Sequence, residues 1–156
     1  MHSEADATDT RIQTYPGCDA AARHLMQART SGLTSAGLPQ TYRPQSIGQA
    51  LAIQLRTAAL LQDMHQDSIA AWKCALPAGG KISLAPIYAS KVRHIGEGPF
   101  HLDAFPGQAT THDIEPEIAF ELRHDLPAQT EPYSPEQIDQ AIGKIRLAVE
   151  VLGCRY

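Results

Sequence analysis

The stretch Ile114-Glu-Pro-Glu-Ile-Ala-Phe-Glu-Leu122 alternates between apolar residues and mostly acidic ones. This period of two is typical of a β-strand, because successive side chains of a strand point to opposite faces. The sequence therefore predicts a strand over residues 112–124. One face is formed by Ile114, Pro116, Ile118, Phe120 and Leu122, and Glu115 and Glu117 share the other.

A third glutamate, Glu150, interrupts the apolar run Leu147-Ala-Val-Glu-Val-Leu152. Burying a carboxylate among such neighbours is costly unless it is paired or bound to a metal. Three carboxylates that a fold brings together would suit a hard divalent cation such as Mg²⁺ or Mn²⁺. Strand alternation also allows a plain alternative, in which all three face water on half-exposed strands.

Outward from this stretch, helices come first and strands later, which indicates an α+β domain. Periodicity and turn residues predict helices over 18–30, from Ser46 to about Asp63, and from Ser134 to about Gly143. Strands are expected over 69–76, 82–88 and 145–152, with a turn at 77–80 and a loop over 96–108. Residues 1–15 are expected to form a mobile tail.

Composition narrows the class of protein. Of the 156 residues, 43% are hydrophobic and 19% charged, and the formal net charge of −4 gives no electrostatic case for nucleic acid or an anionic membrane. The sequence shows neither a signal peptide nor an apolar run long enough to span a membrane. The three cysteines, Cys18, Cys74 and Cys154, favour a reducing compartment. The cytoplasm is the expected location, with the cysteines as small buried hydrophobes.

Lys73 lies in the run Ala71-Trp-Lys-Cys-Ala75. One interpretation is an edge lysine whose amine reaches water along its apolar stem. The other is a lysine in a pocket, which transfers a proton or holds an anionic substrate.

Several segments together resemble the 2-keto-4-pentenoate hydratase and 4-oxalocrotonate decarboxylase family of the fumarylacetoacetate hydrolase superfamily. The segments are Ala50-Leu-Ala-Ile-Gln54, Trp72-Lys73, Glu115-Pro-Glu-Ile-Ala-Phe120 and Ala148-Val-Glu150-Val with Arg155, so the resemblance covers about residues 40–156. It implies that Glu115, Glu117 and Glu150 ligate Mg²⁺ or Mn²⁺. It also implies that Lys73 is catalytic and that Lys73 and Gln54 contact the substrate.

The implied function is a metal-dependent hydratase of aromatic catabolite degradation, which adds water to a 2-hydroxy-dienoate or 2-oxo-alkenoate. Three alternatives stay open: a 2-oxo acid decarboxylase, an acylpyruvate carbon–carbon hydrolase, and a non-catalytic truncated module that folds only against a partner. The expected partners are a small 2-oxo acid and further copies of the chain in a homo-oligomer.

For the fold, the resemblance implies N-terminal helices followed by a mixed, barrel-like β-sheet. Residues 16–156 would form a single hydratase-like domain. The final strand reaches the last residues of the chain, so we expect the barrel to be incomplete and the domain to lack its C-terminal part.

Overall fold

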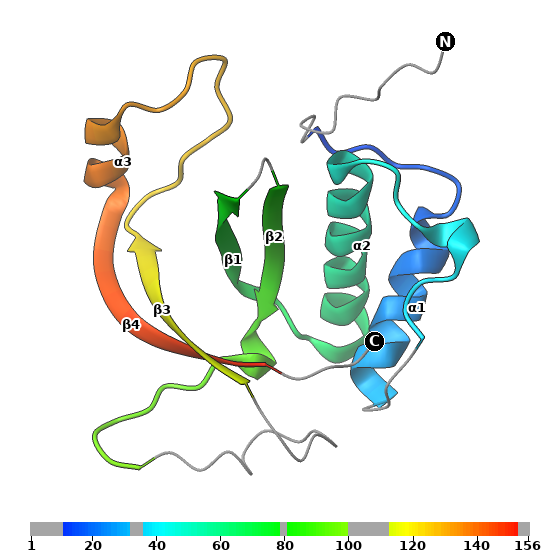
Figure 1. Ribbon diagram of the computed structural model, residues 1–156, viewed down its shortest axis with the longest axis horizontal. Helices are drawn as coiled ribbons and strands as arrows, with labels where there is room; N and C mark the ends of the chain where they lie inside the picture. Colours follow the sequence, from blue (N-terminus) through cyan, green and yellow to red (C-terminus); the bar gives the residue numbers. More distant parts are fainter. Residues whose placement is uncertain (1–10, 32–35, 79–80, 100–112, 153–156) are drawn as a thin grey trace. The chain divides into compact units, whose positions relative to one another are not determined.

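A computed structural model describes residues 11–31, 36–78, 81–99 and 113–152. These residues fall into two compact units, which are described separately (Figure 1). The first contains two α-helices and a two-stranded sheet, and the second contains two strands and a short helix. The expected single domain over 16–156 stays a prediction. Of the expected tail, residues 1–10 lie outside the described residues.

The first unit begins with α1 (Cys18–Ser31) and α2 (Ile47–His65). As predicted, Ser46 caps α2: its side chain accepts a hydrogen bond from the Gln49 amide at 3.2 Å. The helix continues two residues beyond the predicted end at Asp63, because Gln66 adopts a left-handed conformation and terminates it there. None of the described helices has both the length and the apolar character needed to cross a membrane.

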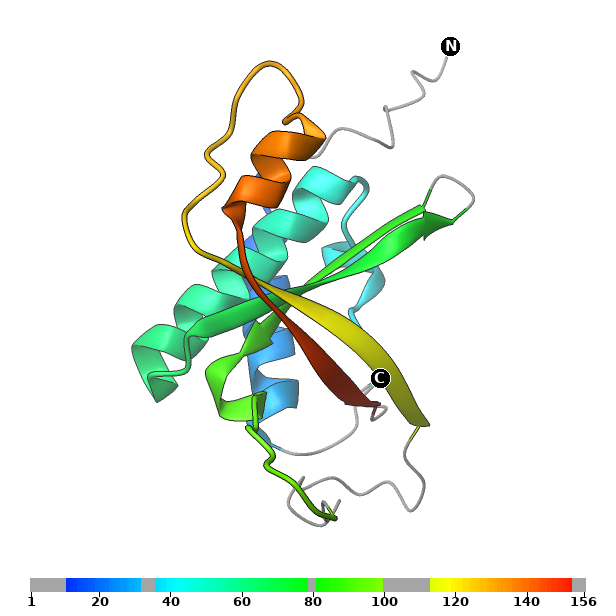
Figure 2. The same ribbon diagram turned by 90° about the vertical axis from the view of Figure 1, so that its left-hand side faces the viewer.

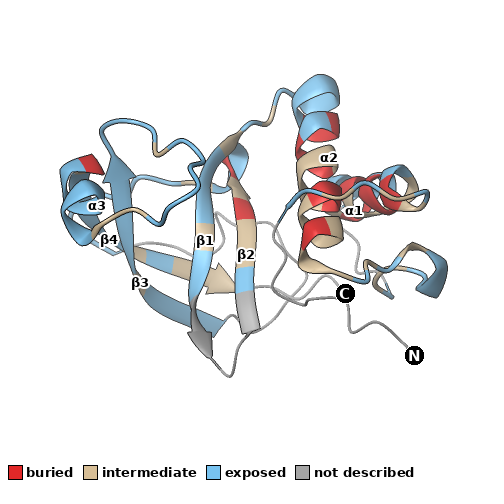
Figure 3. Ribbon diagram, turned by 90° about the horizontal axis from the view of Figure 1, so that it is seen from above, coloured by how far each residue is buried: buried red, intermediate tan, exposed pale blue. Residues whose placement is uncertain are grey.

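Small residues bring α1 and α2 into close contact. Ala21, Ala22 and Ala52 are buried in their interface, and the largest fully buried side chains are Ile53 and Thr57 of α2. Figure 3 shows that most of the buried residues lie on these two helices. Thr57 satisfies its buried hydroxyl by donating to the Ile53 carbonyl at 2.8 Å.

Residues 11–13 lie against the start of α2. The Gln13 amide donates to the Gly48 carbonyl at 3.1 Å, and a side chain at position 48 would place its Cβ 2.0 Å from the Arg11 carbonyl oxygen. Only glycine leaves room for this backbone approach. This backbone contact at Gly48 therefore holds the segment that precedes α1 against the start of α2.

The first sheet is formed by β1 (Ile69–Ala78) and β2 (Lys81–Tyr88), which pair antiparallel. Two 3₁₀-helices, Gln40–Tyr42 and Ala89–Lys91, lie in the connections. Tyr88 ends β2 with only 2% of its surface exposed, and the Arg29 guanidinium of α1 lies 4.9 Å from the centre of its ring.

Two sequence predictions are wrong in this sheet. Pro77 lies inside β1 rather than in a turn, which a two-stranded sheet permits because each strand is an edge. Cys74 is exposed, since its apolar neighbours on β1 are themselves mostly exposed, whereas Cys18 is buried as predicted. Cys154 and most of the predicted loop over 96–108 lie outside the described residues.

The second unit contains β3 (Asp113–Leu122), α3 (Pro135–Ala141) and β4 (Ile142–Leu152). Figure 2 shows β3 and β4 side by side in a twisted two-stranded sheet, hereafter the ribbon. Ser134 and Gln137 form the predicted capping box of α3. The helix ends at Ala141, two residues before the prediction. Gly143 instead belongs to β4, where an added Cβ would lie 3.1 Å from the Glu121 carbonyl oxygen.

The α+β class is confirmed. Within the described residues the strands form two separate antiparallel pairs, β1 with β2 and β3 with β4, and no closed barrel. The larger barrel-like sheet stays a prediction.

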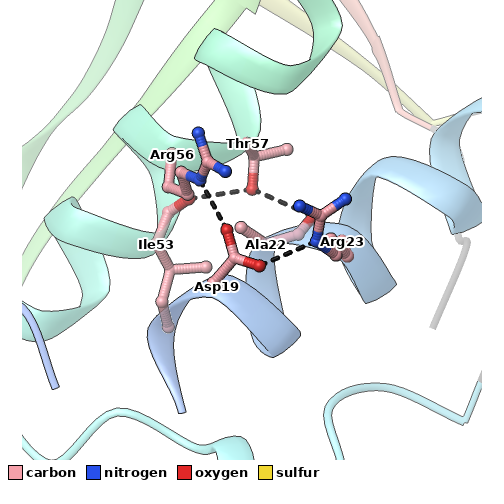
Figure 4. A network of polar contacts seen from close by, with 6 residues as sticks. All are labelled: Asp19, Ala22, Arg23, Ile53, Arg56 and Thr57. Atoms are coloured by element: carbon pink, nitrogen blue, oxygen red, sulfur yellow. Dashed lines mark hydrogen bonds and ion pairs between the residues drawn. The ribbon is translucent and has the colours of Figure 1, made fainter. Parts of the chain in front are cut away.

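A polar contact on the surface joins α1 to α2 (Figure 4). Asp19 accepts a hydrogen bond from the Nε atom of Arg23 and another from the Nε atom of Arg56, each at 2.7 Å. These two hydrogen bonds hold the pKa of Asp19 below its usual value of 3.8. The ionised carboxylate therefore favours the folded state above that value.

We expect acid to remove this contribution as the pH falls through the lowered pKa of Asp19. In Asp19→Asn, the free energy of unfolding should be lower than in the wild type near neutral pH, and the difference should disappear in strong acid. Urea unfolding at a series of pH values measures this difference. Glu97→Gln, which changes an exposed loop carboxylate, is the control. The prediction fails if the Asp19→Asn difference is the same at every pH.

Candidate metal centre

The ladder of the ribbon brings the three predicted glutamates together. Glu115 on β3 lies directly opposite Glu150 on β4, and Glu117, opposite Ala148, is the diagonal neighbour of Glu150. Directly opposed residues of an antiparallel pair share one face, and long side chains reach their diagonal neighbours. The period-two pattern of each strand thus places all three carboxylates on the same side. Glu115, Glu117 and Glu150 are hereafter the glutamate cluster.

The spacing of the glutamate cluster is compatible with one cation. One carboxylate oxygen from each residue lies within 4.8 Å of the other two. Two oxygens that bind the same Mg²⁺ at about 2.1 Å lie roughly 3 to 4 Å apart, so small side-chain rotations would complete the contact. Glu115 is exposed, whereas Glu117 and Glu150 are partly buried. The donor set therefore fits a hard divalent cation that keeps part of its water shell.

A second acidic site on the same face is occupied by basic side chains. Glu121 accepts from the Arg146 Nη2 atom at 2.8 Å, and the Lys144 Nζ atom lies 3.5 Å from its other oxygen. The hydrogen bond from Arg146 and the charge of Lys144 lower the pKa of Glu121. No role was predicted for these three residues. The available signal was that Lys144 and Arg146 alternate with apolar residues along the strand that leads to Glu150, so that they share its face.

The opposite face of the ribbon contains only apolar residues and proline. Cross-strand pairs place Ile118 opposite Leu147 and Phe120 opposite Ile145. Seven of its side chains are between 49% and 92% exposed, Leu147 is the most exposed, and Val151 is partly buried. Hereafter, the apolar face means Ile114, Pro116, Ile118, Phe120, Leu122, Ile145, Leu147, Val149 and Val151.

The two other predicted site residues, Lys73 and Gln54, belong to the first unit. Lys73 is partly buried on β1 opposite Ala85, and Gln54 on α2 donates from Nε2 to the Leu84 carbonyl at 2.9 Å. Lys73 and Gln54 thus lie next to two consecutive residues of β2, Ala85 and Leu84. The Oε1 atom of Gln54 is buried and accepts no hydrogen bond within the described residues. Gln54 also lines a cleft of about 200 Å³ between α2 and β2.

The chain matches no family model, and comparisons with curated proteins and with solved structures also found no match.

Proposed function

We propose that this protein is a divalent-metal-dependent hydratase acting on a 2-hydroxy-dienoate or 2-oxo-alkenoate. The observation that supports it most is the convergence of Glu115, Glu117 and Glu150 on one face of the ribbon. Strand alternation accounts for the shared face, but it does not require carboxylates from two strands, 33 residues apart, to occupy adjacent positions. The barrel-like fold of the family belongs to this proposal as well.

In the proposal, the glutamate cluster holds Mg²⁺ or Mn²⁺ through three carboxylates. When bound, such a cation would supply Lewis-acid polarisation of the oxygens of a 2-oxo acid. Lys73 would hold the substrate carboxylate or transfer a proton. Gln54 would contact the substrate through its amide. The hydroxyl and proton of one water molecule add to the double bond and yield a 4-hydroxy-2-oxo acid, so no oxidant or reductant is needed.

The test is turnover of 2-hydroxypenta-2,4-dienoate by the full chain in the presence of Mg²⁺. We expect turnover that stops when EDTA is added. We expect Lys73→Met to lower kcat by roughly 10²- to 10⁴-fold, which is the usual contribution of a positioned proton-transfer group. Lys91→Met, which changes an exposed lysine of the same unit, is the matched control.

One observation favours a second candidate, the non-catalytic module that folds against a partner. The apolar face is largely exposed, and a protein seldom leaves such a surface in water. A non-catalytic module should show neither Mn²⁺ binding nor an effect of Glu150→Ala, whereas a competent enzyme should bind Mn²⁺ and lose that binding in the variant.

A further inference from the structure

The ribbon has little core of its own. Among its described residues and those of α3, Ala141 alone is buried. An isolated two-stranded sheet is marginally stable in water, and stability requires that a hydrophobic face be covered. The apolar face is therefore the part of the second unit that most needs a partner.

The area of the apolar face is what one side of a protein interface requires. Its seven large exposed side chains are Ile114, Ile118, Phe120, Leu122, Ile145, Leu147 and Val149. At roughly 200 Å² for each fully exposed side chain, their exposed fractions correspond to about 860 Å². This is comparable to the share of one partner in a standard interface and exceeds the largest apolar patch of a typical monomer.

The composition of the apolar face favours a second copy of the same chain. It contains no charged residue, so two identical faces bring no like charges together. Interfaces between identical subunits are also the more apolar class, whereas transient partners usually meet through mixed polar surfaces. The three carboxylates of the glutamate cluster lie on the opposite face together with Glu121, Lys144 and Arg146, and all six charged side chains would remain accessible in such a pair.

We propose that two copies of this chain associate through the apolar face, ribbon against ribbon, in a twofold-symmetric dimer. The cross-strand pair Ile118 and Leu147 lies at the centre of the face, with further apolar pairs on either side. In a twofold interface the residues nearest the axis meet their own counterparts. Leu147, which is 92% exposed, would therefore contact Leu147 or Ile118 of the second copy.

The first test is sedimentation of the full chain over a range of concentrations. We expect a species of twice the chain mass of 16.9 kDa. Leu147→Asp should weaken the dimer at least roughly 100-fold, because the buried charge occurs twice in a symmetric interface. Ala119→Asp places the same charge on the opposite face of the ribbon and should leave the dimer intact. Circular dichroism verifies that each variant is folded.

The second test needs no substitution. In a mixture of isotope-labelled and unlabelled chains, we expect intermolecular nuclear Overhauser effects from the methyl groups of Leu147 to those of Leu147 or Ile118 in the second copy. This measurement decides the matter if Leu147→Asp does not fold. A monomer at every concentration would overturn the proposal, since another part of the chain or a different protein would then cover the face. A dimer without these effects would overturn it equally. Neither result depends on whether the glutamate cluster binds a cation.

Discussion

Replacing Glu150 with alanine is expected to abolish specific Mn²⁺ binding. Glu150 is the only member of the glutamate cluster on β4, and it lies directly opposite Glu115. Its removal leaves two carboxylates from a single strand. Loss of a residue that merely supports a metal ligand already costs roughly 10- to 100-fold in affinity, so loss of a ligand should cost at least 100-fold.

Electron paramagnetic resonance of Mn²⁺ measures the free ion directly and provides the affinity. Glu121→Gln is the matched control because it removes a carboxylate from the same face of the same ribbon. Glu121 is held by Arg146 and Lys144, and it is not part of the glutamate cluster. If Glu150→Ala and Glu121→Gln bind Mn²⁺ as tightly as the wild type, the cluster is not a cation site. If both variants lose Mn²⁺ binding, the negative charge of the whole face, rather than the glutamate cluster, accounts for the affinity.

Ile53→Ala is expected to cause the largest loss of stability in the first unit. Ile53 is 2% exposed and is one of the two largest fully buried side chains, in an interface otherwise rich in alanine. Truncation of a buried isoleucine costs about 2–5 kcal/mol through lost burial and the cavity left behind. The same core contains the buried side chains of Met26, Leu60, Leu61 and Tyr88, so the cavity would lie inside packed structure rather than at the surface.

Urea unfolding followed by the helical circular dichroism signal measures this change. Met64→Ala is the control on the same helix, because Met64 is 58% exposed and its truncation should change the free energy of unfolding by less than about 0.5 kcal/mol. Equal effects of the two substitutions would mean that α2 does not pack on α1 through Ile53.

The sequence was most informative where local chemistry determines local structure. Ser46 and Ser134 marked the starts of α2 and α3, because each side chain satisfies an amide that the helix leaves unbonded. The shared face of Glu115 and Glu117 followed from strand periodicity alone.

Element ends were less predictable where a residue departs from its usual role. Gln66 terminates α2 in a conformation that glycine usually adopts. Gly143 has the opposite character: it resembles a helix stop but lies in β4, close to the backbone of β3 at a shift in register. The residue type alone, glutamine at position 66 or glycine at position 143, does not distinguish a helix end from a close contact between two backbones.

Strand pairing was not predictable from the sequence. Backbone hydrogen bonds between strands do not depend on which side chains the strands carry, so the pattern of β3 did not reveal that Glu115 lies opposite Glu150. The convergence of the glutamate cluster was expected from a family resemblance rather than from the residues. Likewise, the sequence pattern of the strands did not indicate that β1 pairs with β2 in one sheet and β3 pairs with β4 in another.

The register between β3 and β4 restricts how the chain length can change near the glutamate cluster. Deleting one residue between Lys144 and Glu150 would turn Glu150 onto the hydrophobic side of the sheet. Deleting two would keep its side but move it by roughly 7 Å along the strand. Insertions and deletions between Lys144 and Glu150 should therefore follow an even-number rule, in which odd changes exchange a carboxylate of the glutamate cluster for an aliphatic side chain.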